Sequence, residues 1–181
     1  MRTLLVLGLA ASLWIFASAT GSLAQGAAAP TENWLSRFKD SLTTPPEPAS
    51  ITVHQQTYVP VYSSVAGAGG LSRLDFSATL AIRNTSASKP LVVEHIDYRD
   101  TAGNLIERYV DHPVAVKPYA TIEVMIATAD VRGGTGASFV VAWGAVGPIE
   151  EPVIQAVMIG VSGPRSFSFL APVQRVRTSG E

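Results

Sequence analysis

The feature that most restricts the fold of this chain is a strict alternation of apolar and polar side chains between residues 74 and 83. Every even-numbered residue in this segment is apolar: Leu74, Phe76, Ala78, Leu80 and Ile82. The odd-numbered residues are polar or small. A period of two is the period of a β-strand that buries one face and exposes the other. The segment is therefore predicted to be a strand that covers a core.

Other stretches rich in β-branched and aromatic residues, each bounded by Gly, Pro, Asn or Asp, predict further strands. They are Thr52–Tyr62, Leu91–Tyr98, Leu105–Val110, Ala120–Ala127, Ser138–Trp143, Val153–Val161 and Ser166–Leu170. Breakers recur about every 8 to 12 residues without a long helical pattern between them, which is typical of antiparallel sheets. We predict an all-β fold over residues 51–175: an immunoglobulin-like antiparallel β-sandwich of about seven or eight strands. A closed barrel is the alternative.

Two local signals refine this prediction. Pro60 cannot donate a backbone hydrogen bond, so the strand Thr52–Tyr62 is predicted to lie at a sheet edge or to carry a bulge. Asp100–Asn104 contains a Gly-Asn pair, which can adopt the positive φ angles of a tight hairpin loop. This segment is predicted to join two strands as a β-hairpin.

The composition supports one domain with a hydrophobic core. The 181 residues are 47% hydrophobic, which suffices for a single core. Met125 and Met158 lie within apolar strands, where methionine is expected to fill gaps in that core. The chain has no cysteine, so no disulfide stabilises the fold, and burial and backbone pairing must do so instead.

The N-terminal region has the pattern of a secretory signal. One arginine precedes an almost wholly apolar run, Leu4–Phe16. Residues 1–24 are predicted to be a signal peptide cleaved between Ala24 and Gln25, and the protein is expected to be periplasmic or secreted. Residues 3–24 are also long enough to span a bilayer, so an uncleaved membrane anchor is the alternative.

Residues 25–50 are rich in Pro and Ala and are predicted to be a linker. Residues 31–42 within it place Trp34 and Phe38 on one face at the helical period, which predicts a short helix. This helix is expected either to dock on the sandwich or to bind a membrane surface or a partner. Trp34 and Phe38 are therefore interaction candidates. Contact with a membrane is expected only through this helix or an uncleaved signal.

The charge pattern argues against a nucleic-acid partner. The formal net charge is −1 and the chain contains no run of Lys and Arg. Binding to a polyphosphate needs such a basic surface. No nucleic acid is therefore expected among the partners.

No motif in the chain predicts catalysis or a cofactor. Ser86–Lys89 matches Ser-x-x-Lys, but the companion motifs of penicillin-binding enzymes are missing. Arg132–Gly136 is glycine-rich, but a predicted strand follows it instead of the helix that a phosphate cradle requires, so a turn is expected. The neighbouring acids Glu150 and Glu151 would point to opposite faces of a strand. We predict that the protein is not an enzyme, with an envelope hydrolase as one alternative.

His95, Asp97, Asp100 and Asn104 are the residues that best suit a metal ion. The oxygen side chains cluster around a turn and would suit Ca²⁺, whereas the histidine would suit Zn²⁺ or Cu²⁺. Their spacing departs from that of an EF-hand loop, and Asp and Asn also shape turns by bonding to their own backbone. No metal site is therefore predicted, and these four residues are only candidates.

Five short sequence motifs follow one another along the chain in a characteristic order. They are Tyr58-Val59-Pro60-Val61-Tyr62, Leu80-Ala81-Ile82-Arg83-Asn84-Thr85, Ile96-Asp97-Tyr98, Gly133-Gly134-Thr135-Gly136-Ala137, and Glu151-Pro152 leading to Ala156-Val157-Met158-Ile159-Gly160. Together they resemble a family of exported bacterial proteins, domain of unknown function 3124. The resemblance covers the region from Val53 to Leu170. It implies a compact exported domain and implies no activity, because the family is uncharacterised.

These patterns lead to the hypothesis of a non-catalytic periplasmic binding module of the cell envelope. It would contact a protein or another macromolecule through an edge strand or through the loops at one end of the sandwich. Tyr58 and Tyr62 are candidate contact residues. The alternative is a small-ligand or metal-binding protein built around His95 or the turn Asp97–Asn104.

Overall fold

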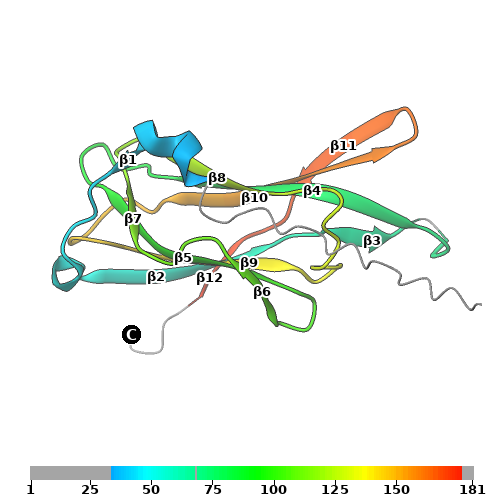
Figure 1. The fold of residues 1–181 in the computed structure, drawn as a ribbon, viewed down its shortest axis with the longest axis horizontal. Helices are drawn as coiled ribbons and strands as arrows, with labels where there is room; N and C mark the ends of the chain where they lie inside the picture. The colour runs from blue at the N-terminus through cyan, green and yellow to red at the C-terminus, as the bar shows by residue number, and fades with distance from the viewer. Residues whose placement is uncertain (1–33, 68, 177–181) are drawn as a thin grey trace, which may run out of the picture.

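The computed structural model describes residues 34–67 and 69–176, and this part of the chain forms two stacked antiparallel sheets (Figure 1). The first sheet contains β1 (Leu42–Thr43), β2 (Val53–Pro60), β5 (Leu91–Arg99), β6 (Leu105–Arg108), β7 (Val114–Val116), β9 (Ser138–Ala145) and β12 (Gln174–Val176). The second contains β3 (Ser64–Ala66), β4 (Arg73–Arg83), β8 (Thr121–Ile126), β10 (Val153–Ser162) and β11 (Arg165–Leu170). Two short 3₁₀ helices precede β2: η1 (Leu35–Ser41) and η2 (Pro48–Ser50).

The first sheet has the strand order β1-β7-β5-β9-β2-β12, and β6 pairs with β5 beside this path. β2 and β9 pair along the whole of β2, with Val53 opposite Ala145 and Pro60 opposite Ser138. The pairing of β5 with β9 shifts between Val93 and His95, which marks a β-bulge at that point.

The second sheet has the order β11-β10-β4-β3, and β8 also pairs with β4. β4 is its central strand, because β10 lies along one edge while β3 and β8 share the other. The predicted alternation is confirmed: Phe76, Ala78, Leu80 and Ile82 are buried. One face of β4 therefore packs against the core and the other faces the outer surface, as a period of two requires.

The core fills the space between the two sheets. Its largest buried side chains come from both layers: Tyr98, Phe139, Leu80, Ile82, Leu91, Ile96, Ile122, Ile126 and Met158. The rings of Tyr98 and Phe139, on neighbouring strands, have centroids 5.2 Å apart. Each such side chain contributes roughly 1.5–3 kcal/mol by leaving water, so this core holds the described fold together. The chain has no cysteine to add a disulfide.

The prediction of an all-β fold of two antiparallel sheets is confirmed. The eight predicted strands are present, with ends that differ by about two residues. Sequence patterns missed β1, β3, β7 and β12, which have two or three residues each. The immunoglobulin-like strand order is not confirmed by these pairings. The predicted signal peptide, residues 1–24, lies outside the described residues.

The predicted edge position of the first long strand is wrong. β2 pairs with β9 on one side and with β12 on the other, where Gln56–Tyr58 meet Gln174–Val176. Pro60 is the last residue of β2. Its missing N–H therefore falls at the end of the ladder, where an interior strand tolerates proline.

A short helix lies within the predicted residues 31–42, and part of the predicted linker packs on the sandwich. Between Leu35 and Ser41 the chain forms the 3₁₀ helix η1, and Phe38 within it has non-helical angles (φ −112°, ψ 15°). Leu42 and the next residue then pair with β7 as strand β1. The described part of residues 25–50 thus belongs to the fold, because its apolar side chains pack against the core. No helix in residues 34–67 or 69–176 is long and apolar enough to cross a membrane.

Candidate interaction surface

Asp100 and Asn104 close the hairpin between β5 and β6. The amides of Ala102 and Asn104 donate to Asp100 Oδ1 at 2.9 and 2.8 Å, and Asn104 Nδ2 donates to Asp100 Oδ2 at 3.0 Å. Gly103 completes the turn with φ +86°. Both of these candidate oxygen ligands therefore shape their own turn.

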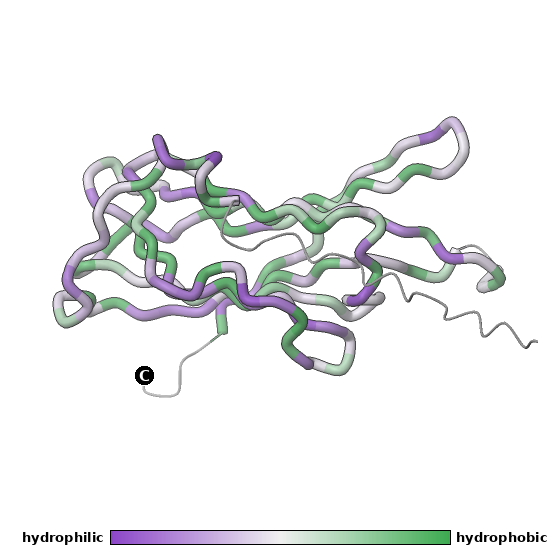
Figure 2. Tube along the Cα trace, viewed as in Figure 1, coloured by the Kyte–Doolittle hydropathy of each residue, from purple (hydrophilic) through white to green (hydrophobic). Residues whose placement is uncertain are grey.

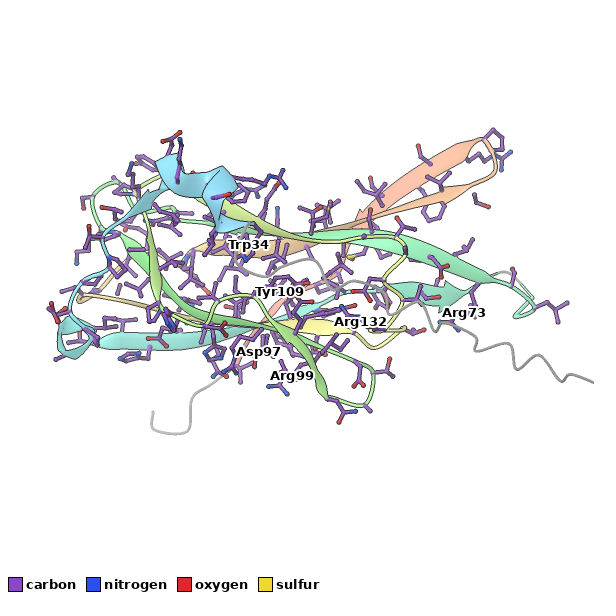
Figure 3. The ribbon with its side chains drawn as sticks, viewed as in Figure 1. Trp34, Arg73, Asp97, Arg99, Tyr109 and Arg132 are labelled. Carbon is purple, nitrogen blue, oxygen red and sulfur yellow. The ribbon has the colours of Figure 1, made fainter. Side chains whose placement is uncertain are left out.

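Asp97 lies on β5 and is held by two arginines. Arg108 on β6 donates from Nε and Nη2 to the two carboxylate oxygens at 2.7 and 3.0 Å, and Arg99 Nη2 donates to Oδ2 at 2.9 Å. The Asp97 side chain is only 2% exposed. Burial raises the pKa of this carboxyl, but the hydrogen bonds and charge of Arg108, with Arg99, outweigh burial and leave the pKa below its usual value. The carboxylate is thus committed to an ion-pair cluster on the first sheet (Figure 3).

His95 is half-buried on the same strand face as Asp97. A different histidine forms the nearby polar contact: His54 Nδ1 lies 2.6 Å from Glu94 Oε1. The two side chains meet over Gly144 of β9, where an added Cβ would lie 3.2 Å from Glu94 Oε1. Across residues 34–67 and 69–176, no three or more His, Cys, Asp or Glu side chains are grouped to hold a metal ion. The structure does not bring the four predicted metal candidates together.

The glycine-rich segment Arg132–Gly136 is a braced turn at one end of the sandwich. Gly134 N donates to Ser63 Oγ at 2.7 Å, and Thr101 Oγ1 donates to Gly133 O at 2.9 Å. Arg132, labelled in Figure 3, pairs with Asp130 and Glu107. These bonds tie the turn to two other loops at this end of the sandwich.

Trp34 and Phe38 pack on the protein itself in this structure. Trp34 Nε1 donates to the carbonyl oxygen of Tyr109 at 3.1 Å, and the two rings meet edge to face with centroids 6.4 Å apart (Figure 3). Phe38 lies 6.2 Å from Trp34, and both side chains are half-buried against the core. Their proposed role in binding a partner stays a prediction.

Tyr58 and Tyr62 lie in different environments. Tyr58 is half-buried on β2, whereas Tyr62 packs on Phe169 of β11 with centroids 5.8 Å apart. Phe169 in turn meets Phe76 at 5.3 Å, and Phe76 meets Phe167 at 5.7 Å. Tyr62 is therefore part of an aromatic cluster that supports the β10–β11 hairpin.

The outer face of the second sheet is unusually apolar for a face turned to water. Exposed fractions are 61% for Met125 on β8, 45% and 68% for Ile159 and Val161 on β10, and 55% for Leu170 on β11. We call these four residues the outer apolar face. Met158 is in the core as predicted, but the core position predicted for Met125 is wrong.

The strand register places these four residues on one outer face of the second sheet, with polar residues of β4 such as Ser77 and Thr79 between Met125 and the others. Leu170 lies opposite Val157, Val157 opposite Thr79, and Thr79 opposite Met125, so one row crosses four strands. The outward positions of β10 and β11 carry no charge: Val153, Gln155, Val157, Ile159, Val161, Ser166, Ser168 and Leu170. An antiparallel sheet that only meets solvent usually alternates with polar side chains on its outer face. Exposed apolar side chains concentrated on two neighbouring strands in this way are typical of an interaction site.

The hairpin of β10 and β11 carries this face beyond the body of the sandwich (Figure 1). Its arms are white to green on the hydropathy scale, with one strongly hydrophilic segment near the tip (Figure 2). Gly160 allows the hairpin to pack on the aromatic cluster. A Cβ at Gly160 would lie 2.8 Å from Phe76 and 2.9 Å from Phe167, so a side chain there would push the rings apart.

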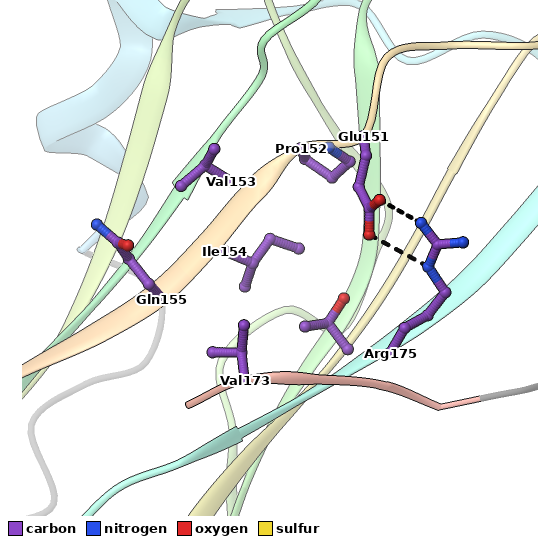
Figure 4. Close-up of a pocket in the computed structure, with 8 residues that line it drawn as sticks. Glu151, Pro152, Val153, Ile154, Gln155, Val173 and Arg175 are labelled. Atoms are coloured by element: carbon purple, nitrogen blue, oxygen red, sulfur yellow. Dashed lines mark hydrogen bonds and ion pairs between the residues drawn. The ribbon is translucent and has the colours of Figure 1, made fainter. Parts of the chain in front are cut away.

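A shallow groove runs between the start of β10 and β12 (Figure 4). It encloses about 430 Å³ and is open to solvent on one side. Its polar rim is an ion pair between Glu151 and Arg175, with Arg175 Nε 3.1 Å from Glu151 Oε1. Val153 and Val173 supply much of its apolar wall. Four of its eight lining residues are polar, Thr57, Glu151, Gln155 and Arg175, but Glu151 and Arg175 pair with each other and Thr57 Oγ1 accepts a hydrogen bond from Trp143 Nε1.

The class that the fold defines is an all-β sandwich of two stacked antiparallel sheets. The model of a protein family described as "Protein of unknown function (DUF3124)" matches residues 54–176, and the chain belongs to this family. No curated protein matches the chain. Among solved structures, the chain is similar to the crystal structure of Thermotoga maritima 1070, with 12% identity and a TM-score of 0.38. That similarity covers 66% of this chain and 92% of the other.

Proposed function

We propose that this chain is a non-catalytic binding module of the bacterial cell envelope, and that its outer apolar face contacts a partner protein. The observation that supports this proposal is the exposure of Met125, Ile159, Val161 and Leu170 on the outer face of one sheet. Each Å² of apolar surface left in water costs roughly 25 cal/mol relative to a buried one. A partner that covers this face recovers that free energy.

The shape of the face favours a macromolecule over a small ligand. The row from Leu170 to Met125 lies across four neighbouring strands of one sheet, so the face is broad. Small molecules usually bind in concave sites that bury most of their surface. The metal-binding alternative has less support, because Asp97 holds Arg99 and Arg108, and Asp100 holds the β5–β6 turn.

An exported location is part of the proposal and comes from the sequence. The apolar run Leu4–Phe16 after an N-terminal arginine has the order of a secretory signal. The lack of cysteine is compatible with a periplasm. Envelope proteins are therefore the partners to test.

The proposal is tested with the double variant Met125→Asp, Ile159→Asp. Both side chains are exposed, so the substitutions place charge on the face without entering the core. The matched control is Gln56→Asp, on β2 of the first sheet. The purified proteins are compared in thermal unfolding and then in chemical crosslinking within an envelope extract.

We expect all three proteins to unfold at similar temperatures. Wild type and Gln56→Asp should crosslink to the same partner, and the double variant should lose at least about nine-tenths of that product. Equal crosslinking by the double variant, or no specific crosslinked product for wild type, would contradict the proposal.

A further inference from the structure

β11 is an open sheet edge with none of the usual protection against pairing. It is the last strand of its sheet and, among the strands in residues 34–67 and 69–176, pairs only with β10. Five of its six residues are exposed, and only Phe169 is half-buried. Its pairing with β10 shows no bulge, the strand contains no proline, and its single charge is Arg165 at the start. Edge strands normally use charges, proline or bulges to prevent association with another strand.

The geometry of the hairpin identifies which backbone groups face outward. Gly163 and its neighbour form a two-residue loop, with φ +59° at Gly163 and with Ser162 opposite Arg165. The residues that flank a two-residue loop form a hydrogen-bonded pair, and such pairs alternate along an antiparallel ladder. Phe167 therefore points its N–H and C=O toward β10, as Phe169 does. The same groups of Ser166, Ser168 and Leu170 point away from the sheet, where no other described strand lies.

We propose that the occupant of this edge is β11 of a second copy of the chain, paired antiparallel around a twofold axis at Ser168. In this register, Ser168 of each copy lies opposite Ser168 of the other, and Ser166 lies opposite Leu170. The outward N–H and C=O groups of all three residues are then paired. A twofold axis makes one interface from one self-complementary patch.

The side chains fit this register. On the core side of the sheet it places Phe167 of each copy opposite Phe169 of the other, which gives two aromatic pairs across the interface. Aromatic pairs opposite one another stabilise adjoining antiparallel strands. Arg165 falls opposite Ala171, so the only charge on β11 does not meet a like charge. The projection of the hairpin beyond the sandwich leaves room for a second copy (Figure 1).

The expected dimer is concentration-dependent. A six-residue strand is about 20 Å long, so pairing of two such edges buries an area at the low end for protein interfaces. The dimer would join two second sheets into one and double the length of the outer apolar face. This inference does not depend on the proposed function.

The test introduces a charge at the proposed axis. Ser168→Lys places two ammonium groups opposite one another, and Ser168→Asp places two carboxylates there. An equal mixture of the two variants instead pairs opposite charges. The matched control is Ser88→Lys, also at an exposed serine but in the loop between β4 and β5. Sedimentation of each purified protein is measured from about 5 µM to about 500 µM, the range for a weak interface.

Wild type and Ser88→Lys should form a dimer as the concentration rises. Ser168→Lys and Ser168→Asp alone should raise the dissociation constant at least about tenfold, and their mixture should restore a heterodimer. A wild-type protein that stays monomeric throughout, or a dimer that Ser168→Lys leaves unchanged, would overturn the inference. Met125 lies on β8, three strands away from β11, so Met125→Asp should leave the dimer unchanged while it weakens crosslinking to the envelope partner; this variant separates the dimer from the proposed function.

Discussion

Asp97 shows how a residue that resembles a ligand stabilises the fold. Its pKa is lower in the folded protein than its ordinary value of 3.8, since Arg108 and Arg99 favour the charged form. A carboxyl with a depressed pKa contributes stability above its unfolded pKa, and this contribution is lost as the pH falls through the folded value. The ion-pair cluster should therefore stabilise the protein at neutral pH and fail in acid.

We expect Asp97→Asn to lower the free energy of unfolding by about 1–3 kcal/mol near neutral pH, because two arginines lose a buried partner. The difference from wild type should shrink as the pH falls below about 4. Urea unfolding at a series of pH values measures both effects. Asp40→Asn, at an exposed position on η1, is the control. A difference between Asp97→Asn and wild type that is independent of pH would contradict this role for the carboxylate.

The backbone of Tyr119 adopts a strained conformation. It is 73% exposed and has φ +59°, a left-handed conformation that side chains other than glycine disfavour. It follows Pro118 in a turn closed by a 3.1 Å bond from Ala120 N to Lys117 O. Glycine relieves the strain at the third position of such a turn.

Tyr119→Gly should therefore raise the free energy of unfolding by about 0.5–1 kcal/mol, measured by chemical denaturation. Tyr119→Ala removes the ring but keeps a Cβ, so it should give no comparable gain. Equal stabilisation by both variants would show that the aromatic ring, and not the backbone conformation, is unfavourable.

At the scale of elements, Trp34 is one of the contacts that hold η1 to the sandwich, together with the bonds of Lys117 to Asp40 O and Ser41 O. Trp34→Ala removes the bond to Tyr109 O and two edge-to-face ring contacts. We expect a loss of roughly 1–3 kcal/mol and faster trypsin cleavage at the exposed Arg37 and Lys39. Trp34→Phe keeps an aromatic ring and should give an intermediate rate. Unchanged cleavage in Trp34→Ala would show that another contact holds η1.

The elements that could be predicted from sequence are the strands that bury one face and expose the other. β4 alternates because one face meets the core, and its pattern gave the correct strand and the correct buried residues. β2 was misplaced because a proline at a strand end looks the same in sequence as a proline in an edge strand. The strands of two or three residues were missed because they are too short to show a period.

The functional candidates were less predictable, for a physical reason. β10 has apolar residues on both faces, which in sequence resembles a fully buried strand or a helix. Exposure of Ile159 and Val161 emerges only once β4 and β11 flank the strand and no other described element covers its outer side. The long-range pairs of Asp97 with Arg108 and of His54 with Glu94 likewise require the register of the strands. Consecutive apolar residues in a strand that is predicted to lie at the surface are the sequence signal that would have indicated the outer apolar face.

At the scale of the whole molecule, the two outer faces differ in chemistry. The first sheet carries ion pairs such as His54 with Glu94 and Asp97 with Arg108. The second presents the outer apolar face. This asymmetry leads us to expect that contact with a partner leaves the first sheet in water and covers the second.

Cysteine labelling tests this expectation most directly, because the chain has no cysteine of its own. Ile159→Cys reports on the outer apolar face and Gln56→Cys on the first sheet. Each variant is labelled with a thiol reagent as purified protein and within the cell envelope. The account predicts that labelling at position 159 slows at least about tenfold in the envelope, while labelling at position 56 keeps its rate. Equal rates at position 159 in both settings would contradict the account.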